Sequence, residues 1–107
     1  MFDLFSKMVE MKARMEEVKQ ALAELQVEGE AGGGLVKVTI TGERKALKVA
    51  IDPSLLTASE QDVLQDLIVA AFNLATEKAE EQGAALVKEK TAGLIPNIPG
   101  LDFGFGK

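Results

Sequence analysis

Apolar residues near the start of the chain recur at alternating intervals of four and three residues. They form a heptad stripe of seven residues: Leu4, Met8, Met11, Met15, Val18, Leu22 and Leu25. Because no glycine or proline interrupts this segment, the spacing predicts a single helix over residues 2–25. Cations flank the stripe on both sides and would repel each other in a symmetric self-coil. We therefore expect a helix of another type to cover most of the stripe.

Two runs in the middle of the chain alternate apolar and polar residues with the period of a β-strand. β-Branched residues take every second position at Val36, Val38 and Ile40, and large apolar residues do so at Leu47, Val49 and Ile51. With turn residues between them, the two runs predict an antiparallel hairpin. A shorter alternation over residues 25–31 adds a first strand, so the sequence predicts a three-stranded antiparallel sheet over residues 25–51.

The alternation also predicts a second face of the hairpin that is small and only mildly polar. The residues of this face are Thr39, Thr41, Ala46, Lys48 and Ala50. A three-stranded sheet with one covered face leaves this surface and the strand edges unpaired. We therefore predict an obligate homodimer whose interface includes these residues.

A second long helix is predicted over residues 60–90, after Asp52 and Pro53 end the sheet. Ser59 begins the sequence Ser-Glu-Gln-Asp, which resembles an N-cap with an acid three residues later. The buried stripe of this helix is expected at Leu64, Ile68, Ala71, Ala75, Ala79 and Leu86. The helix is about 46 Å long, whereas a compact domain of 107 residues is only about 34 Å across. It must therefore project from the globule or lie on a second subunit.

The composition changes after residue 90. The segment 91–107 is rich in glycine and proline and still carries leucine, isoleucine and phenylalanine. The prolines and glycines exclude a continuing helix, so we expect an extended tail. Its apolar residues indicate that the tail docks in part, or only in an assembly, and a frayed terminus is an equal alternative.

The absence of both cysteine and histidine narrows the possible chemistry. Such a chain has no disulfide, no thiolate or ordinary zinc site, and no cysteine or histidine catalysis. Paired acids such as Glu80 and Glu81 lie next to each other on helix faces rather than across a cleft. We expect no catalytic site, metal, cofactor or small-molecule substrate. The apolar runs are shorter than the about 20 residues that span a bilayer, and we expect a cytoplasmic protein without a membrane partner.

Three segments resemble the signature sequences of the YbaB/EbfC family of bacterial nucleoid-associated proteins. They are GLVKVTITG at 34–42, VAIDPSLL at 49–56 and LQDLIVAAFNLA at 64–75. This resemblance implies an α+β fold of the order α-β-β-β-α, in which a three-stranded antiparallel sheet is flanked by two long helices. It also implies a tweezers-like homodimer that grips double-stranded DNA in the nucleoid with little sequence preference and without enzymatic activity.

If the two helices pack antiparallel, their free ends lie at one tip that carries several cations. The predicted DNA-binding residues are Lys7, Lys12, Arg14, Lys19, Lys88 and Lys90. Such groups contact phosphates, and a chain without Trp or Tyr offers few platforms for base stacking, so the duplex backbone is the expected target. However, the net charge is −5, and the outer part of the second helix mixes its lysines with glutamates. The alternative is a non-enzymatic protein-interaction scaffold with weak or no DNA binding.

Overall fold

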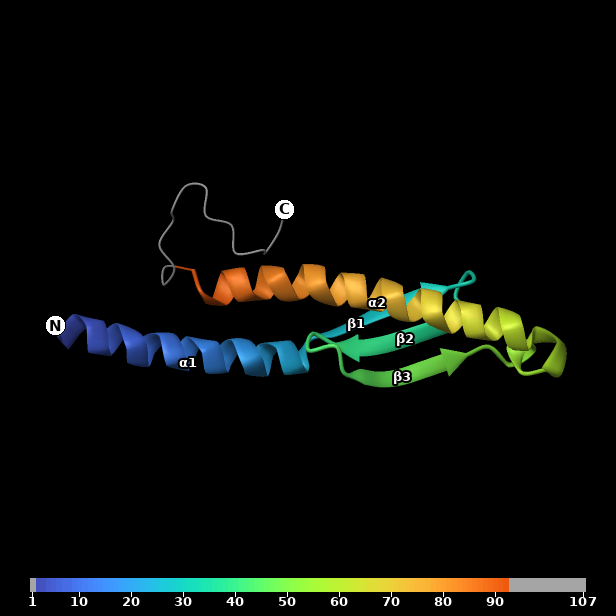
Figure 1. Ribbon diagram of the computed structural model, residues 1–107, viewed down its shortest axis with the longest axis horizontal. Helices are drawn as coiled ribbons and strands as arrows, with labels where there is room; N and C mark the ends of the chain where they lie inside the picture. The colour runs from blue at the N-terminus through green and yellow to red at the C-terminus, as the bar shows by residue number, and fades with distance from the viewer. Residues whose placement is uncertain (1, 93–107) are drawn as a thin grey trace.

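The computed structural model describes residues 2–92, in which one long helix lies along a face of a small antiparallel sheet and a second extends from the end of the sheet (Figure 1). The elements in chain order are α1 (Phe2–Glu24), β1 (Gln26–Ala31), β2 (Val36–Thr41), β3 (Ala46–Ile51) and α2 (Gln61–Lys90). Short 3₁₀ turns at Pro53–Leu55 and Ala58–Glu60 connect β3 to α2. The predicted α-β-β-β-α order is confirmed.

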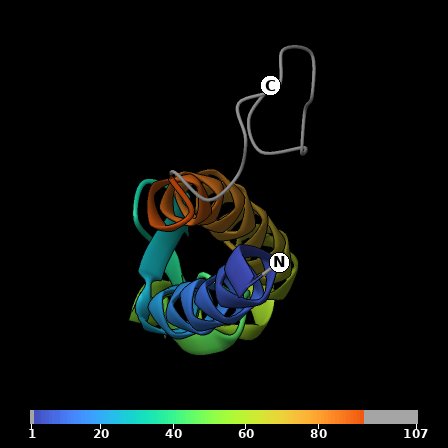
Figure 2. The ribbon, with the colours of Figure 1, turned by 90° about the vertical axis from the view of Figure 1, so that its left-hand side faces the viewer.

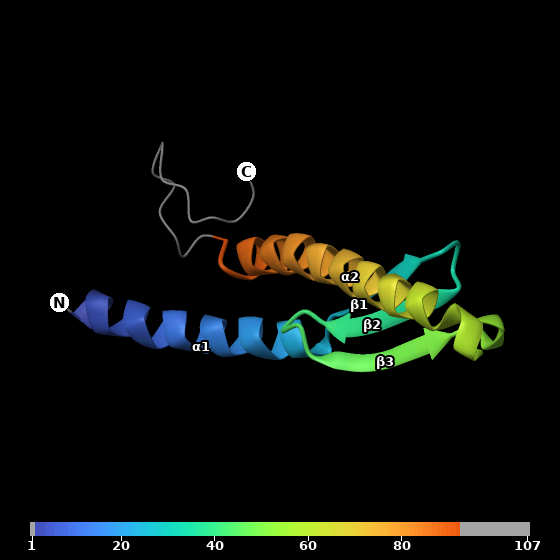
Figure 3. The ribbon, with the colours of Figure 1, turned by 45° about the vertical axis from the view of Figure 1, so that its right-hand side comes forward.

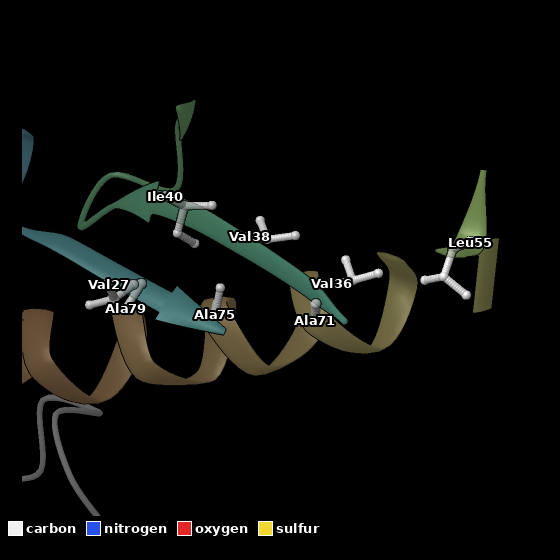
Figure 4. Packing of buried hydrophobic residues seen from close by; sticks show 8 residues of the cluster. All are labelled: Val27, Val36, Val38, Ile40, Leu55, Ala71, Ala75 and Ala79. Atoms are coloured by element: carbon white, nitrogen blue, oxygen red, sulfur yellow. The ribbon is translucent and has the colours of Figure 1, made fainter. Parts of the chain in front are cut away.

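The core lies between α2 and one face of the sheet. The strand order is β1-β2-β3, and both strand pairs are antiparallel. Val36, Val38 and Ile40 of β2 are buried, and alanines of α2 face them (Figure 4). These alanines are Ala71, Ala75 and Ala79. The alternation along β2 thus buries one face of the strand, as its sequence predicts.

A glycine in β1 allows α2 to lie close to the sheet. Gly29 pairs with Val38 of β2, and a Cβ atom at Gly29 would clash with the backbone of Ala71 and Ala75. The distance from this Cβ position to the Ala75 Cα is only 2.9 Å. Because α2 presents alanines here, helix and strand approach each other with no long side chain between them.

Strand β3 contains a β-bulge that changes which residues share a face. Thr39 pairs with Lys48, but the register then shifts and Ile40 pairs with Ala46. Residues that pair across an antiparallel ladder lie on the same face, so Ala46 lies on the side of Ile40. The prediction that Ala46 shares a face with Thr39 and Lys48 is therefore wrong, because an extra residue in β3 interrupts the alternation.

Helix α2 packs on β1 and β2 and leaves β3 largely uncovered. Leu47 and Val49 are each 47% exposed, although Val49 pairs with the buried Val38. The helix side of the β3 edge is therefore an exposed apolar surface within the described part of this chain.

Two turns separate the sheet from α2. Asp52 Oδ1 accepts a hydrogen bond from the Ser54 amide at 2.9 Å, and this bond holds the pKa of the Asp52 carboxyl below its ordinary value. The predicted N-cap at Ser59 is wrong, because Ser59 lies inside the second turn with its hydroxyl 3.2 Å from that of Thr57. Glu60 precedes α2 and makes no side-chain cap.

The molecule is elongated because α1 and α2 project from the same end of the sheet (Figures 1 and 3). Its extents are 68 × 27 × 15 Å and its radius of gyration is 19.0 Å. A compact domain of this length has a radius of gyration of about 13 Å, so α2 projects as its length predicts. Within residues 2–92, no helix is long and apolar enough to cross a membrane. The predicted tail spans residues 91–107, of which residues 91 and 92 form a turn and residues 93–107 lie outside the described residues.

Candidate nucleic-acid interface

The two helices form a pair of arms, which are α1 and the part of α2 that extends past the sheet. α1 runs toward the sheet and α2 runs away from it, so the arms are antiparallel and their free ends point the same way (Figures 1 and 2). They touch at their base, where a Cβ at Gly83 would lie 3.3 Å from Leu22 Cδ2. The element order predicts this arrangement, because one helix enters the sheet and the other leaves it.

Positions along the arms follow from the helical rise. Both helices advance about 1.5 Å per residue, and Leu22 of α1 lies beside Gly83 of α2. The predicted cations Arg14 and Lys90 therefore lie at nearly the same level, at the end of α2. Lys7 lies about 12 Å beyond this end, on the part of α1 that has no neighbouring helix in the described chain.

The cations of α1 form two rows that border the heptad stripe. Lys7 and Arg14 are seven residues apart along one flank, and Lys12 and Lys19 are seven residues apart along the other. At about 100° per residue, the four glutamates among residues 4–24 fall behind these flanks. All four cations are exposed or half-exposed. The stripe side of α1 therefore carries positive charge, although the helix as a whole is nearly balanced.

The outer part of α2 is electrostatically mixed. Lys88 and Lys90 lie in its last turn, where cations also interact favourably with the helix dipole. Four glutamates share residues 77–90 with them. Lys78 is engaged elsewhere, because its Nζ donates a hydrogen bond to the Glu28 carbonyl at 2.8 Å. α2 therefore contributes less positive potential to the tip than α1.

Two ion pairs lie along the arms. Arg14 Nη1 is 3.9 Å from Glu17 Oε2, and Arg44 Nη2 is 3.2 Å from Glu80 Oε1. All four side chains are about half exposed, so each pair contributes little to stability. The guanidinium of Arg14 thus remains accessible to solvent, whereas the shorter pair joins the β2–β3 turn to α2.

The β2–β3 turn closes the base of the arms. Arg44 has a φ of +66°, and Thr41 Oγ1 accepts hydrogen bonds from the amides of Glu43 and Lys45, each at 3.1 Å. This turn and the two helices surround a cavity of about 390 Å³. Residues that line it include Leu22, Gly42, Arg44, Ala79, Gly83 and Val87. The cavity is a feature of the tertiary packing that no sequence motif indicated.

The five residues of the predicted dimer face differ in exposure, and they do not all lie on the same side of the sheet. Lys48 is exposed on the outer face, and Thr39 and Ala50 are half-buried there. Thr41 is only 5% exposed and its hydroxyl is used within the chain, while Ala46 lies on the other side of the sheet. The alternation gave no sign of the exposed apolar edge of β3, because it does not tell which strands a helix covers.

The heptad stripe is covered over only part of its length. Val18 is 4% exposed, and Leu22 and Leu25 are half-buried. The four residues nearer the free end are exposed: Leu4 by 67%, Met8 by 63%, Met11 by 46% and Met15 by 50%. The prediction that another helix covers most of the stripe is wrong within this chain, because α2 ends level with Met15.

Among the described residues, acidic side chains do not gather into a chemical site. In the described part of the chain, no three of them are placed to hold a metal ion. The glutamates of the arms lie on exposed or half-exposed helix faces. Solvated carboxylates on such faces have no environment that would suit them to acid–base catalysis.

Comparisons with known proteins agree with this fold. The profile of the YbaB/EbfC DNA-binding family matches residues 1–94. A nucleoid-associated protein of Agrobacterium fabrum is 44% identical over 102 residues, which cover 95% of this chain and 94% of that protein. A nucleoid-associated protein of Bordetella avium is 47% identical over 96 residues, which cover 90% of this chain and 87% of that protein.

Among solved structures, an uncharacterized protein of Helicobacter pylori matches with a TM-score of 0.70 at 23% identity. The match covers 80% of this chain and 90% of that one, and at this identity it concerns the fold alone. The family profile and the two relatives, by contrast, match in sequence over most of the chain. The chain therefore belongs to the YbaB/EbfC family of nucleoid-associated DNA-binding proteins.

Proposed function

We propose that this protein binds double-stranded DNA as a homodimer, mainly through phosphate contacts and with little sequence preference. The observation that carries the proposal is the pair of cation rows on α1, Lys7 with Arg14 and Lys12 with Lys19, on an arm that projects from the sheet (Figure 1). The membership of a DNA-binding family supports DNA as the partner and the nucleoid in the cytoplasm as the place of action. The family is not a known enzyme family.

The cation rows suit the backbone of a duplex. Residues seven apart on a helix are about 10.5 Å apart along its axis, an interval that flexible Lys and Arg side chains can match to phosphates. Phosphate contacts give an affinity that is independent of sequence and falls steeply with salt. A chain without Trp or Tyr lacks the aromatic platforms on which proteins stack the bases of single strands.

The acidic net charge does not decide the affinity at the arms. The Debye length is about 8 Å at physiological salt, so a phosphate at the tip interacts mainly with the charges near it. On the stripe side of α1 these charges are the cation rows. The net charge of −5 instead slows long-range approach to DNA, which makes low salt the best condition for detecting binding.

A homodimer would cover the open surfaces of the sheet and double the number of arms. The edge strand β3 exposes Leu47 and Val49 on the helix side, and Thr39, Lys48 and Ala50 belong to the outer face. Unpaired strand edges and exposed apolar residues are surfaces that a second subunit commonly buries. An interface at this end of the molecule would leave the tips of the arms free for DNA.

The test compares two glutamine variants in mobility-shift titrations on duplexes of unrelated sequence. In the first variant, glutamine replaces Lys7, Lys12 and Arg14, and binding to all duplexes should weaken about equally. The slope of log affinity against log salt should flatten by about 0.9 for each phosphate that the variant no longer neutralises. The matched control replaces Arg44 and Lys45 in the β2–β3 turn and should retain binding. Because all these side chains are at the surface, stability should change by less than about 1 kcal/mol in either variant.

Two results would contradict the proposal. If the turn variant loses binding and the α1 variant keeps it, the basic hairpin is the site and the arms are not. If the wild-type protein binds no duplex at low salt, the second candidate function takes over, which is a protein-interaction scaffold. The exposed part of the heptad stripe is the observation that favours this second function, because an apolar helix face of this size can bind another protein.

A further inference from the structure

We propose that residues 94–105, in the tail of the same chain, cover the exposed part of the heptad stripe. This inference goes beyond the proposed function and does not depend on DNA binding. The exposed part consists of Leu4, Met8, Met11 and Met15. Phe5 and Val9 are also exposed, by 69% and 54%, but at about 100° per residue they lie outside the row of Lys12 and Lys19 and are not part of the stripe. A contiguous apolar surface of this kind marks a place where another segment or molecule binds.

The exposed part of the stripe begins where α2 ends. Leu22 lies beside Gly83, and the equal rise of the two antiparallel helices makes Lys90 level with Met15. Farther along the stripe, the positions of residues 8 and 4 lie about 10 Å and 16 Å beyond the end of α2. In the described part of the chain, no element lies beside them (Figure 1).

The chain leaves α2 close to this surface. Thr91 closes the helix, because its amide and its hydroxyl both donate to the Val87 carbonyl, at 3.0 and 2.7 Å. The Ala92 amide then donates to the Glu89 carbonyl at 3.4 Å and completes the turn. The residues that follow therefore start level with the stretch of α1 between Met15 and Met11.

The tail has the composition of a segment that covers an apolar surface. Its large apolar residues are Leu94, Ile95, Ile98, Leu101, Phe103 and Phe105. Pro96 and Pro99 exclude a helix, and an extended chain advances about 3.3 Å per residue. About five residues therefore reach from the end of α2 to the level of Leu4, so residues 94–105 are long enough to cover the exposed part of the stripe.

The charge pattern favours the tail over a second copy of α1 as the covering segment. In a symmetric pairing of two α1 helices, the row of Lys7 and Arg14 and the row of Lys12 and Lys19 would meet like charges. Residues 93–106 carry a single charge, at Asp102, so the tail can lie between the two rows without repulsion. Attachment to α2 also keeps the tail at a high effective concentration next to the stripe.

The absence of native cysteine makes disulfide trapping in the full chain a direct test. Met8→Cys with Ile95→Cys gives one thiol on the exposed part of the stripe and one on the tail. The matched control is Ala13→Cys with Ile95→Cys, because Ala13 is exposed on the opposite face of α1. Under mild oxidation, the first pair should form an intrachain disulfide at least about tenfold faster than the control, since docking raises the local thiol concentration. Non-reducing electrophoresis and mass spectrometry measure both rates.

Three outcomes would overturn the proposal. Equal rates in the two pairs would indicate a free tail. Disulfides that join two Met8→Cys chains in preference to the intrachain bond would indicate that a second copy covers the stripe. In a mixture of chains with Met8→Cys alone and chains with Ile95→Cys alone, rapid formation of mixed covalent dimers would indicate that the tail belongs to the partner subunit.

A chain that ends after Ala92 provides a second measurement. Without the tail, the stripe should bind an apolar dye more strongly, and the melting temperature should fall by several degrees because less apolar surface is buried. Asn97→Ala in the full chain keeps every apolar residue of the tail and should change neither quantity. Unchanged dye binding and an unchanged melting temperature in the truncated chain would overturn the proposal, whatever the result on DNA binding.

Discussion

Gly29→Ala tests how closely α2 approaches the sheet. Gly29 pairs with Val38 inside the β1–β2 ladder, and the positive φ angles among the described glycines fall at residues 32–34 and not at Gly29. The backbone conformation of Gly29 would therefore accept an alanine. What is lacking is the space for the methyl group of the alanine. The added methyl would clash with the carbonyl oxygen of Ala71 and the amide nitrogen of Ala75. No side-chain rotation can relieve these contacts, because the atoms belong to the helix backbone.

The size of the effect follows from what must move. Ordinary contact begins at 3.4 Å, so α2 would have to lift from β1 by about 1 Å. A gap of roughly 1 Å forfeits about a quarter to a half of the dispersion energy of each contact across it. Overpacking a core costs about 1–3 kcal/mol, and a clash with backbone belongs at the upper end or above. A destabilisation of about 3 kcal/mol lowers the melting temperature of a domain of this size by roughly 12 °C or more.

Thermal unfolding followed by circular dichroism measures this destabilisation, at one protein concentration because dimerisation would make the melting temperature depend on concentration. Gly83→Ala is the matched control. Its Cβ would meet only Leu22 Cδ2, at 3.3 Å, and that side-chain end can move, while the helix gains about 1 kcal/mol of propensity. We expect the control to melt at the wild-type temperature or above it. A Gly29→Ala protein that melts within about 2 °C of the wild type would refute the reasoning.

Two further predictions concern the sheet. Val49→Glu should shift the monomer–dimer equilibrium, measured by sedimentation equilibrium, toward the monomer, because a dimer that covers the β3 edge would bury the new charge. The control Val69→Glu, on the exposed side of α2, should leave this equilibrium unchanged. A wild-type protein that is monomeric at micromolar concentration would contradict the homodimer itself. Thr41→Val should lower the free energy of unfolding by about 1–3 kcal/mol, because the amides of Glu43 and Lys45 lose their acceptor, and Thr41→Ser should cost less. Identical denaturation midpoints for all three proteins would show that these hydrogen bonds contribute nothing.

The strands illustrate what a periodic pattern can predict and where it fails. Val36, Val38 and Ile40 alternate along β2 and are buried together, as the pleat of a strand requires. Leu47 and Val49 follow the same alternation in β3 and are nevertheless exposed. The pattern states which residues share a face, but the position of α2 across the sheet decides which strand is covered. The sequence pattern does not indicate the β-bulge either, because the residues around it continue the alternation without a break.

The candidate site, like the strands, could be predicted from the sequence only in part. Seven-residue intervals place Lys7 with Arg14 and Lys12 with Lys19 on the flanks of one helix, and this much depends on helix geometry alone. The length of the stripe that α2 leaves exposed depends on how the two helices are aligned. That alignment brings Leu22 beside Gly83, a long-range contact that no local pattern reports.

One row of small residues in α2 sets the geometry of both arms. The row is Ala71, Ala75, Ala79 and Gly83, which follow one another at intervals of four and are all buried. Its first two residues lie against Gly29 in β1, and its last lies beside Leu22 in α1. The same face of α2 therefore fixes the distance of this helix from the sheet and its distance from α1. Since Leu22 is the one long side chain among these contacts, the separation of the arms is set close to the backbone. The positions of the α1 cations relative to those of α2 are thus determined by residues that carry no charge.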